Sequence, residues 1–153
     1  MDIEGVIAAL DSDNRDEVLK CLYGLSGPHR DLKLPEFVME ALRKLILSAD
    51  DEISWRAQFL LGLVWGDLGS LPFIVQRLSR HDEDNLVFAT GLDAIFVIAQ
   101  RHPQESFGSS IEVAGDLAQR SRSPELVQIS TLLKKFLQRE IGEEEYRASK
   151  SST

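Results

Sequence analysis

Two segments in the middle of the chain are apolar on nearly every side when they are wound into a helix. Their sequences are ISWRAQFLLGLVW over 53–65 and LVFATGLDAIFVIA over 86–99. A helix of this kind is stable in water only when neighbouring elements cover several of its faces. Both segments are shorter than the ~20 residues that a membrane-spanning helix needs. The sequence therefore predicts a helical protein with these two helices at its centre.

Helical periodicity marks most of the remaining chain. Over 34–48 the apolar residues recur at the i, i+3, i+4, i+7 spacing, and charged residues fall on the opposite face. Ser123 and Pro124 form a suitable start for another helix. We expect an all-α domain over 1–141 and a flexible polar tail over 142–153. The helices are expected at roughly 2–10, 14–25, 34–48, 51–66, 70–80, 84–101, 104–120 and 124–139.

The charge balance restricts the partners of this protein. Its 153 residues include 25 Asp and Glu against 17 Lys and Arg, which gives a formal net charge of −8. Nucleic-acid binding depends on a basic surface, so we expect no nucleic-acid partner. An acidic protein is instead steered toward a basic partner protein. The alternative is that the acidity only keeps the protein in solution.

The start of the chain and its cysteine content indicate a compartment. The segment Met1-Asp2-Ile3-Glu4 lacks the basic region that opens a secretory signal. The single cysteine, Cys21, excludes an internal disulfide framework and fits a reducing environment. We expect a cytoplasmic protein without membrane contact, present as a monomer or a weak homo-oligomer.

Four junctions between predicted helices resemble one another. Each runs from an apolar helix through serine and acidic residues into a second apolar helix. They begin at Leu10, Leu47, Leu78 and Ala118. Small residues recur late in the second helices, at Gly24, Gly62 and Ala94. A unit of two helices that repeats every ~32–40 residues is typical of an α-solenoid.

On these residues the chain resembles HEAT repeats, including the HEAT-like repeats of bilin lyases. Asp50-Asp51-Glu52-Ile53 is similar to the acidic turn of the family, and the small and aliphatic residues over 57–64 match its second helix. The resemblance is best over 47–100. Ser54 stands where the family has an arginine, and Arg56 follows two residues later, which departs from the Asp–Arg ladder of the family. The resemblance implies a right-handed α-solenoid of about four helical hairpins.

No pattern in the sequence points to catalysis, a cofactor or a metal. The three histidines, His29, His81 and His102, are not spaced as metal ligands. The chain has neither a GxSxG nucleophile elbow nor a glycine-rich phosphate loop. Cys21 lies in an apolar stretch without a nearby histidine, which favours an inert buried thiol. We therefore expect no enzymatic activity and no cofactor.

Three residues allow two or more interpretations. Asp93 stands in the most apolar helix, and a buried carboxylate must be paired or protonated. It could tie this helix to a neighbour through Arg56 or Thr90, bind a partner on the concave face, or be a functional group with a raised pKa. Trp55 and Trp65 could belong to the core or to a binding hot spot.

Acidic residues gather where three of the second helices begin. The clusters are Asp11/Asp13/Asp16/Glu17, Asp50/Asp51/Glu52 and Asp82/Glu83/Asp84. Equivalent turns of a solenoid stack along one edge, so these clusters would form one acidic edge. Either each cluster stabilises the N-terminus of its own helix, or the edge docks a basic partner.

Together these features predict a non-catalytic protein–protein interaction module that uses its concave face and its acidic edge. An immunity protein that masks a basic toxin and an adaptor both fit this class. The alternative is a HEAT-like enzyme accessory or nucleic-acid-associated protein, similar to bilin lyases or alkylpurine glycosylases. The partner-binding candidates expected at solvent-facing positions are Asp16, Ser54, Gln58, Asp84, Asn85 and Gln128. Asp51 and Asp93 are further candidates.

Overall fold

The two apolar segments form the helices around which the others pack. In the computed structural model, which describes residues 1–151, the first segment spans α4 (Asp51–Gln58) and the π-helical turn η2 (Phe59–Val64). The second segment forms α6 (Asn85–Arg101), which packs against α4, η2, α5 and α8. Phe88, Leu92 and Ile95 of α6 are fully buried. The predicted central position of these segments is confirmed.

The other elements are helical as well, and the described residues contain no strand. The predicted all-α class is therefore confirmed. The remaining elements are α1 (Ile3–Leu10), α2 (Arg15–Ser26), α3 (Glu36–Lys44), η1 (Leu45–Leu47), η3 (Leu68–Ser70), α5 (Leu71–Leu78), α7 (Gly108–Arg120), α8 (Pro124–Leu137) and α9 (Glu143–Ser151). None of the helices within 1–151 combines the length and the apolar content of a bilayer span.

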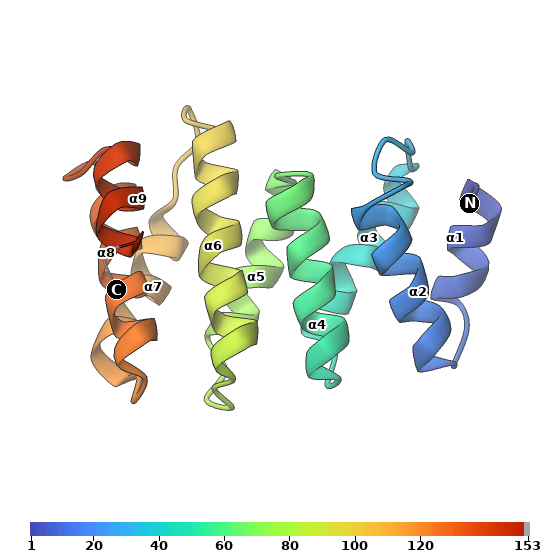
Figure 1. The fold of residues 1–153 in the computed structure, drawn as a ribbon, viewed down its shortest axis with the longest axis horizontal. Helices are drawn as coiled ribbons and strands as arrows, with labels where there is room; N and C mark the ends of the chain where they lie inside the picture. The colour runs from blue at the N-terminus through green and yellow to red at the C-terminus, as the bar shows by residue number, and fades with distance from the viewer. Residues whose placement is uncertain (152–153) are drawn as a thin grey trace.

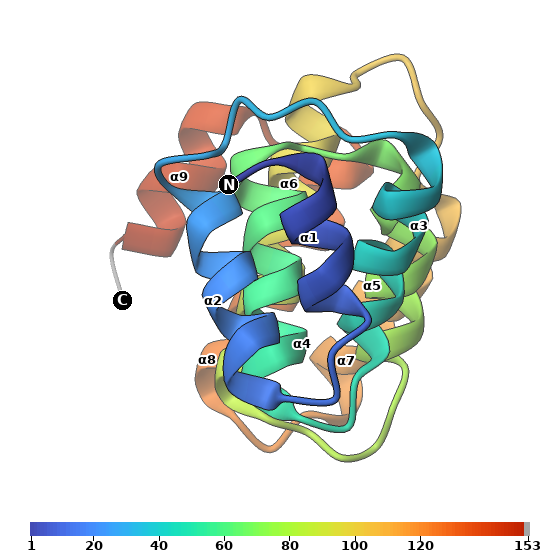
Figure 2. The same ribbon diagram turned by 90° about the vertical axis from the view of Figure 1, so that its right-hand side faces the viewer.

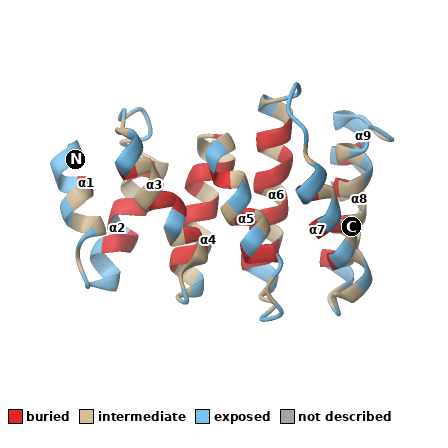
Figure 3. Ribbon diagram, turned by 180° about the vertical axis from the view of Figure 1, so that it is seen from behind, coloured by how far each residue is buried: buried red, intermediate tan, exposed pale blue. Residues whose placement is uncertain are grey.

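The helices lie in two layers. Figure 1 shows α2, α4, α6 and α8 side by side in chain order along the long axis, and Figure 2 shows α3, α5 and α7 on the other side of the molecule. We call these the second-helix layer and the first-helix layer. At the N-terminal end, α1 packs on α2 of the second-helix layer and on α3 of the first-helix layer. Figure 3 shows that the buried residues concentrate in the middle of the row, above all on α4 and α6.

The segment of α4 and η2 approaches α6 closely at two glycines. A Cβ atom on Gly62 would lie 2.2 Å from the Cβ of Ala94, and a Cβ on Gly91 would lie 2.6 Å from Oε1 of Gln58. Both distances are far below van der Waals contact. At Gly62 the added atom would overlap Ala94 itself, whereas at Gly91 it would displace the buried Gln58 side chain. The small residues that the sequence places late in successive second helices thus contact each other across the helix pair.

Arginines tie consecutive helices of the first-helix layer at equivalent places. Arg80, just after α5, donates to the carbonyl of Leu47 at the end of η1 (2.9 Å). Arg120, at the end of α7, donates to the carbonyls of Leu78 (2.8 Å) and Arg80 (3.1 Å). Helix C-termini carry carbonyls without intrahelical partners and favour cations. Each arginine therefore gives a hydrogen-bond donor to a carbonyl at the C-terminal end of the preceding helix.

The expected flexible tail after Gly142 is wrong over the described part of the chain. Residues Glu143–Ser151 form α9, and the side chain of Tyr146 is 1% exposed. The tail is polar in composition, but one aromatic side chain finds an apolar slot on α6 and α8, and this contact orders the helix. Residues 152–153 of the expected tail lie outside the described residues.

We predict that Gly62→Ala lowers the free energy of unfolding by about 1–3 kcal/mol, because the added methyl group overlaps Ala94 and forces the two central helices apart. The matched control is Gly115→Ala in α7, where a Cβ would lie 3.6 Å from the flexible Lys134 side chain. This control should raise stability by about 0.5–1 kcal/mol. Urea unfolding followed by circular dichroism measures both; equal effects would contradict the close-contact account.

Candidate functional site

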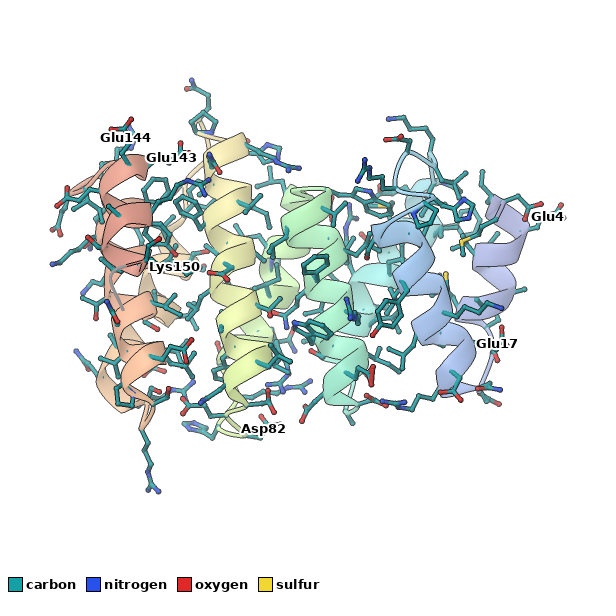
Figure 4. The ribbon with its side chains drawn as sticks, in the orientation of Figure 1. Glu4, Glu17, Asp82, Glu143, Glu144 and Lys150 are labelled. Atoms are coloured by element: carbon teal, nitrogen blue, oxygen red, sulfur yellow. The ribbon has the colours of Figure 1, made fainter. Side chains whose placement is uncertain are left out.

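The three acidic clusters lie at one edge of the molecule. The N-termini of α2, α4 and α6 point to the same side in Figure 1, and Figure 4 labels Asp82 there. We call this the acidic edge. Three side chains on it cap helices: Asn14 accepts from the backbone N–H of Asp16, Asp50 accepts from Glu52 and Ile53, and Asp84 accepts from Val87. Capping thus accounts for two of the acids, Asp50 and Asp84.

Two arginines partly neutralise the acidic edge. Nε of Arg15 donates to Asp50 (2.5 Å), and its Nη2 donates to Glu52 (2.8 Å). The hydrogen bond from Arg15 lowers the pKa of Asp50. Arg77, which is 1% exposed, lies 3.3 Å from Asp51 and 3.5 Å from Asp82. The spacing of the acids and the net charge do not indicate that these two arginines pair with the edge, although Arg15 itself stands inside the first junction.

The candidates Asp16 and Asn85 are exposed, as expected. Asp16 is the most open, with 88% of its side chain exposed. Asp51 and Asp84 also lie at the edge, but the first is paired with Arg77 and the second caps α6. Among these four, Asp16 and Asn85 neither cap a helix nor pair with a buried arginine; Asp16 lies 3.8 Å from the half-exposed Arg15.

The candidates Ser54 and Gln58 do not face solvent, and this expectation is wrong. Both side chains are fully buried. Oγ of Ser54 donates to the carbonyl of Ile46 (2.5 Å), and Nε2 of Gln58 donates to the carbonyl of Val87 (3.3 Å). The two residues stand one helical turn apart on the inner side of α4. Both side chains donate hydrogen bonds to backbone carbonyls of neighbouring elements. The spacing of polar residues in the sequence does not show that such buried acceptors are nearby.

Asp93 and Gln128 both contact α9. Asp93 pairs with Lys150 of α9 rather than with Arg56 or Thr90, the partners considered from the sequence. Nε2 of Gln128 donates to the carbonyl of Ser149 (3.4 Å). These two candidates therefore lie under the C-terminal helix, apart from the acidic edge.

An aromatic–arginine patch lies on the outer side of the second-helix layer. It consists of Tyr23 from α2 together with Trp55, Arg56 and Phe59 from α4 and η2. The guanidinium carbon of Arg56 lies 3.8 Å from the Tyr23 ring centroid and 3.9 Å from that of Trp55. The rings of Trp55 and Phe59 are 6.4 Å apart. Tyr23 is 44% exposed, and the other three are half-buried, so the patch is open to solvent along one side.

The sequence pointed to the patch only in part. It offered Trp55 as either a core residue or a hot-spot residue, and Arg56 as a partner of Asp93. In the structure Arg56 instead joins two adjacent second helices through its two ring contacts. Its buried Nε finds no hydrogen-bond partner among the described residues. Cation–π contacts of this kind hold a guanidinium in place without neutralising its charge.

A second charged cluster lies beside a hollow of about 520 Å³ between the α2–α3 loop and η2. Arg43 donates to both oxygens of Asp67 (2.8 and 2.9 Å) and to Glu36 and Glu40. Burial raises the pKa of Asp67, but the hydrogen bonds from Arg43 and Ser70 outweigh it and hold that pKa below its usual value. The cluster ties α3 to the turn after η2.

Trp65 lines the same hollow. Its indole N–H donates to the carbonyl of Arg30 (2.9 Å), and its ring packs against the core. Of the two tryptophans, Trp65 therefore anchors the α2–α3 loop, whereas Trp55 belongs to the aromatic–arginine patch.

We predict that Asp84→Ala lowers the free energy of unfolding by about 1 kcal/mol, since it removes the cap of α6. Asp16→Ala, an equal loss of charge at an exposed position of the same edge, should change it by less than about 0.5 kcal/mol. Urea titrations at neutral pH compare the two variants. Similar losses for both would show that overall charge, rather than capping, stabilises this edge.

We further predict that Asp67→Asn costs about 2 kcal/mol at pH 7, because Arg43 loses the least exposed of its three carboxylate partners. The pKa of Asp67 is lower in the folded than in the unfolded protein, so its contribution is present above the unfolded pKa and is lost as pH falls through the folded pKa. The stability gap between wild type and variant should therefore narrow in acid. Unfolding free energies measured from pH 7 to pH 3 test this; a gap that stays constant would contradict it.

Two kinds of reactive group can be checked in the described residues, a metal cluster and a free thiol. No group of three or more His, Cys, Asp or Glu side chains within 1–151 is placed to hold a metal ion. Cys21 is buried, and burial raises the pKa of its thiol to about 11, which keeps it protonated at neutral pH.

No protein-family model, no curated protein and no solved structure matches this chain.

Proposed function

We propose that the chain is a HEAT-like α-solenoid of about four helical hairpins, and that its second-helix layer binds a partner protein without catalysing a reaction. The two-layer row of helices supports the solenoid arrangement. The ties from Arg80 to Leu47 and from Arg120 to Leu78 support it as well, because they join successive first helices at equivalent places. A repeat architecture of this kind presents one long face built from its second helices.

The observation that carries the binding role is the aromatic–arginine patch. Tryptophan, tyrosine and arginine are the residue types most enriched at binding hot spots, and here all three are in contact on one exposed face. The stacking of Arg56 between Tyr23 and Trp55 holds the patch in shape before a partner arrives. A preorganised surface loses less conformational entropy on binding.

The charge near the patch indicates the chemistry of the partner. Tyr23 and the exposed Asp16 both belong to α2 and stand about two helical turns apart, so one helix carries part of the patch and an open carboxylate of the acidic edge. A partner with an apolar or aromatic centre flanked by lysine or arginine complements this surface. A standard interface takes ~800 Å² from each partner, about a tenth of the 8070 Å² that this chain exposes. A cytoplasmic immunity protein that masks a basic toxin and an adaptor are both instances of this function.

We predict that the double variant Tyr23→Ala/Trp55→Ala loses its partner while keeping its fold. Tagged full-length protein is used to capture partners from a lysate of the host, and the recovered proteins are quantified by mass spectrometry. A partner that binds the patch should fall at least tenfold in recovery with the double variant, because truncation of a hot-spot residue costs ~2 kcal/mol or more.

The matched control is Phe37→Ala, which truncates an aromatic side chain that is 66% exposed on α3 of the first-helix layer. Recovery of the partner should be unchanged with this control, and should fall as salt concentration rises. Equal recovery with the double variant and the wild type would refute the second-helix layer as the binding surface. Loss with Phe37→Ala alone would place the interface on the opposite layer.

A further inference from the structure

The C-terminal helix α9 lies on the second-helix layer, against α6 and α8. Figure 1 shows it at the C-terminal end of the row, and Figure 4 labels Lys150 on the side of α9 that faces α6. Lys150 pairs with Asp93 of α6, and Gln100 of α6 donates to Glu143 of α9. The helix therefore covers part of the face that the aromatic–arginine patch leaves open farther along the row.

The contact beneath α9 is an aromatic slot formed by Phe96 of α6 and Phe136 of α8. Tyr146 stacks on Phe96, with ring centroids 4.1 Å apart and planes at 10°. Phe136 closes the slot, 4.7 Å from Phe96 and 5.7 Å from Tyr146. Two adjacent second helices thus provide a site that takes one aromatic side chain from a helix lying across them.

The fit between α9 and this slot is imperfect. Tyr146 is the one buried residue of α9. The exposed Arg147 adds a guanidinium 5.2 Å from the Phe96 ring centroid and donates to Gln100 (3.3 Å). The Tyr146 hydroxyl is buried and has no hydrogen-bond partner among the described residues, which disfavours its burial. The link from α8 passes through Arg139, a non-glycine residue at φ 62°, where an L-residue is strained.

The surroundings of the slot leave room for a larger occupant. A hollow of about 970 Å³ adjoins the N-terminal end of α9, lined by Phe107 and Ile111 of the α7 side together with Phe136, Ile141 and Glu145. The other end of the slot carries the Asp93 carboxylate. A helix longer than α9 could therefore fill more of this surface while keeping a cation opposite Asp93.

We propose that the slot is a docking site for a partner helix that presents a phenylalanine and, one turn later, a lysine or arginine, and that α9 occupies this site in the free protein. Phenylalanine suits the slot because the described residues offer the Tyr146 hydroxyl no hydrogen-bond partner, and the cation one turn later reproduces the Lys150–Asp93 pair. This inference rests on the proposed role of the second-helix layer as a binding surface. Partner binding then requires α9 to leave, so α9 lowers the apparent affinity of every competitor for the slot by the same factor.

A peptide of residues 142–153 with Tyr146→Phe and a fluorescent label at its N-terminus tests this site. It is titrated by anisotropy against three full-length proteins: wild type, Tyr146→Ala, and Tyr146→Ala/Asp93→Lys. We expect saturable binding to Tyr146→Ala, where the resident helix has lost its anchor. Binding to wild type should be at least tenfold weaker because α9 competes, and the added Asp93→Lys should weaken binding at least tenfold through charge repulsion.

Lys150→Glu provides a second way to release α9 without removing an apolar side chain, since it places a carboxylate beside Asp93. If circular dichroism shows that Tyr146→Ala does not fold, Lys150→Glu replaces it in the titration. The same peptide should bind the Lys150→Glu protein more tightly than it binds wild type. Absence of saturable binding at millimolar peptide to the folded variant, equal binding to wild type and variant, or indifference to Asp93→Lys would each overturn the inference. Partner capture that depends on Tyr23 and Trp55 would still support the proposed function, so the two failures are distinguishable.

Discussion

The contact between Gly62 and Ala94 sets the distance between the two central helices, and the rest of the structure depends on it. With no side chain on Gly62, α4 and η2 approach α6 closely enough for Nε2 of Gln58 to reach the carbonyl of Val87. The outer face of α4, which carries Trp55 and Arg56, is held in place by the same packing. A larger residue at this contact would move the aromatic–arginine patch relative to α6.

Charge acts on two scales in this protein. The net charge of −8 produces a long-range field that favours basic partners. At contact distance, however, Arg15 pairs with Asp50 and Glu52, and Arg77 pairs with Asp51. The Asp84 carboxylate accepts a hydrogen bond from the first turn of α6. The exposed carboxylate of Asp16 near the start of α2 therefore differs from those that cap a helix or pair with a buried arginine.

The second-helix layer contains two aromatic features that differ in their state. The aromatic–arginine patch on α2 and α4 is open, while the slot on α6 and α8 is filled by Tyr146 of the same chain. Both are built where neighbouring second helices meet. The two features therefore differ in accessibility: one is open to solvent, and the other is covered by α9.

The sequence by itself determined the all-α class, the approximate position of the helices up to Leu137 and the central place of the two apolar segments, because apolar periodicity reports which faces of a helix are buried. It also located the three acidic clusters. Only the tertiary structure decided that Ser54 and Gln58 serve buried carbonyls, that Arg56 stacks between Tyr23 and Trp55, and that the polar segment after Gly142 docks through Tyr146. These contacts join residues that are far apart in the chain. The hydrogen-bond or ring partner of such a side chain depends on which helices pack together, and the local sequence does not specify this.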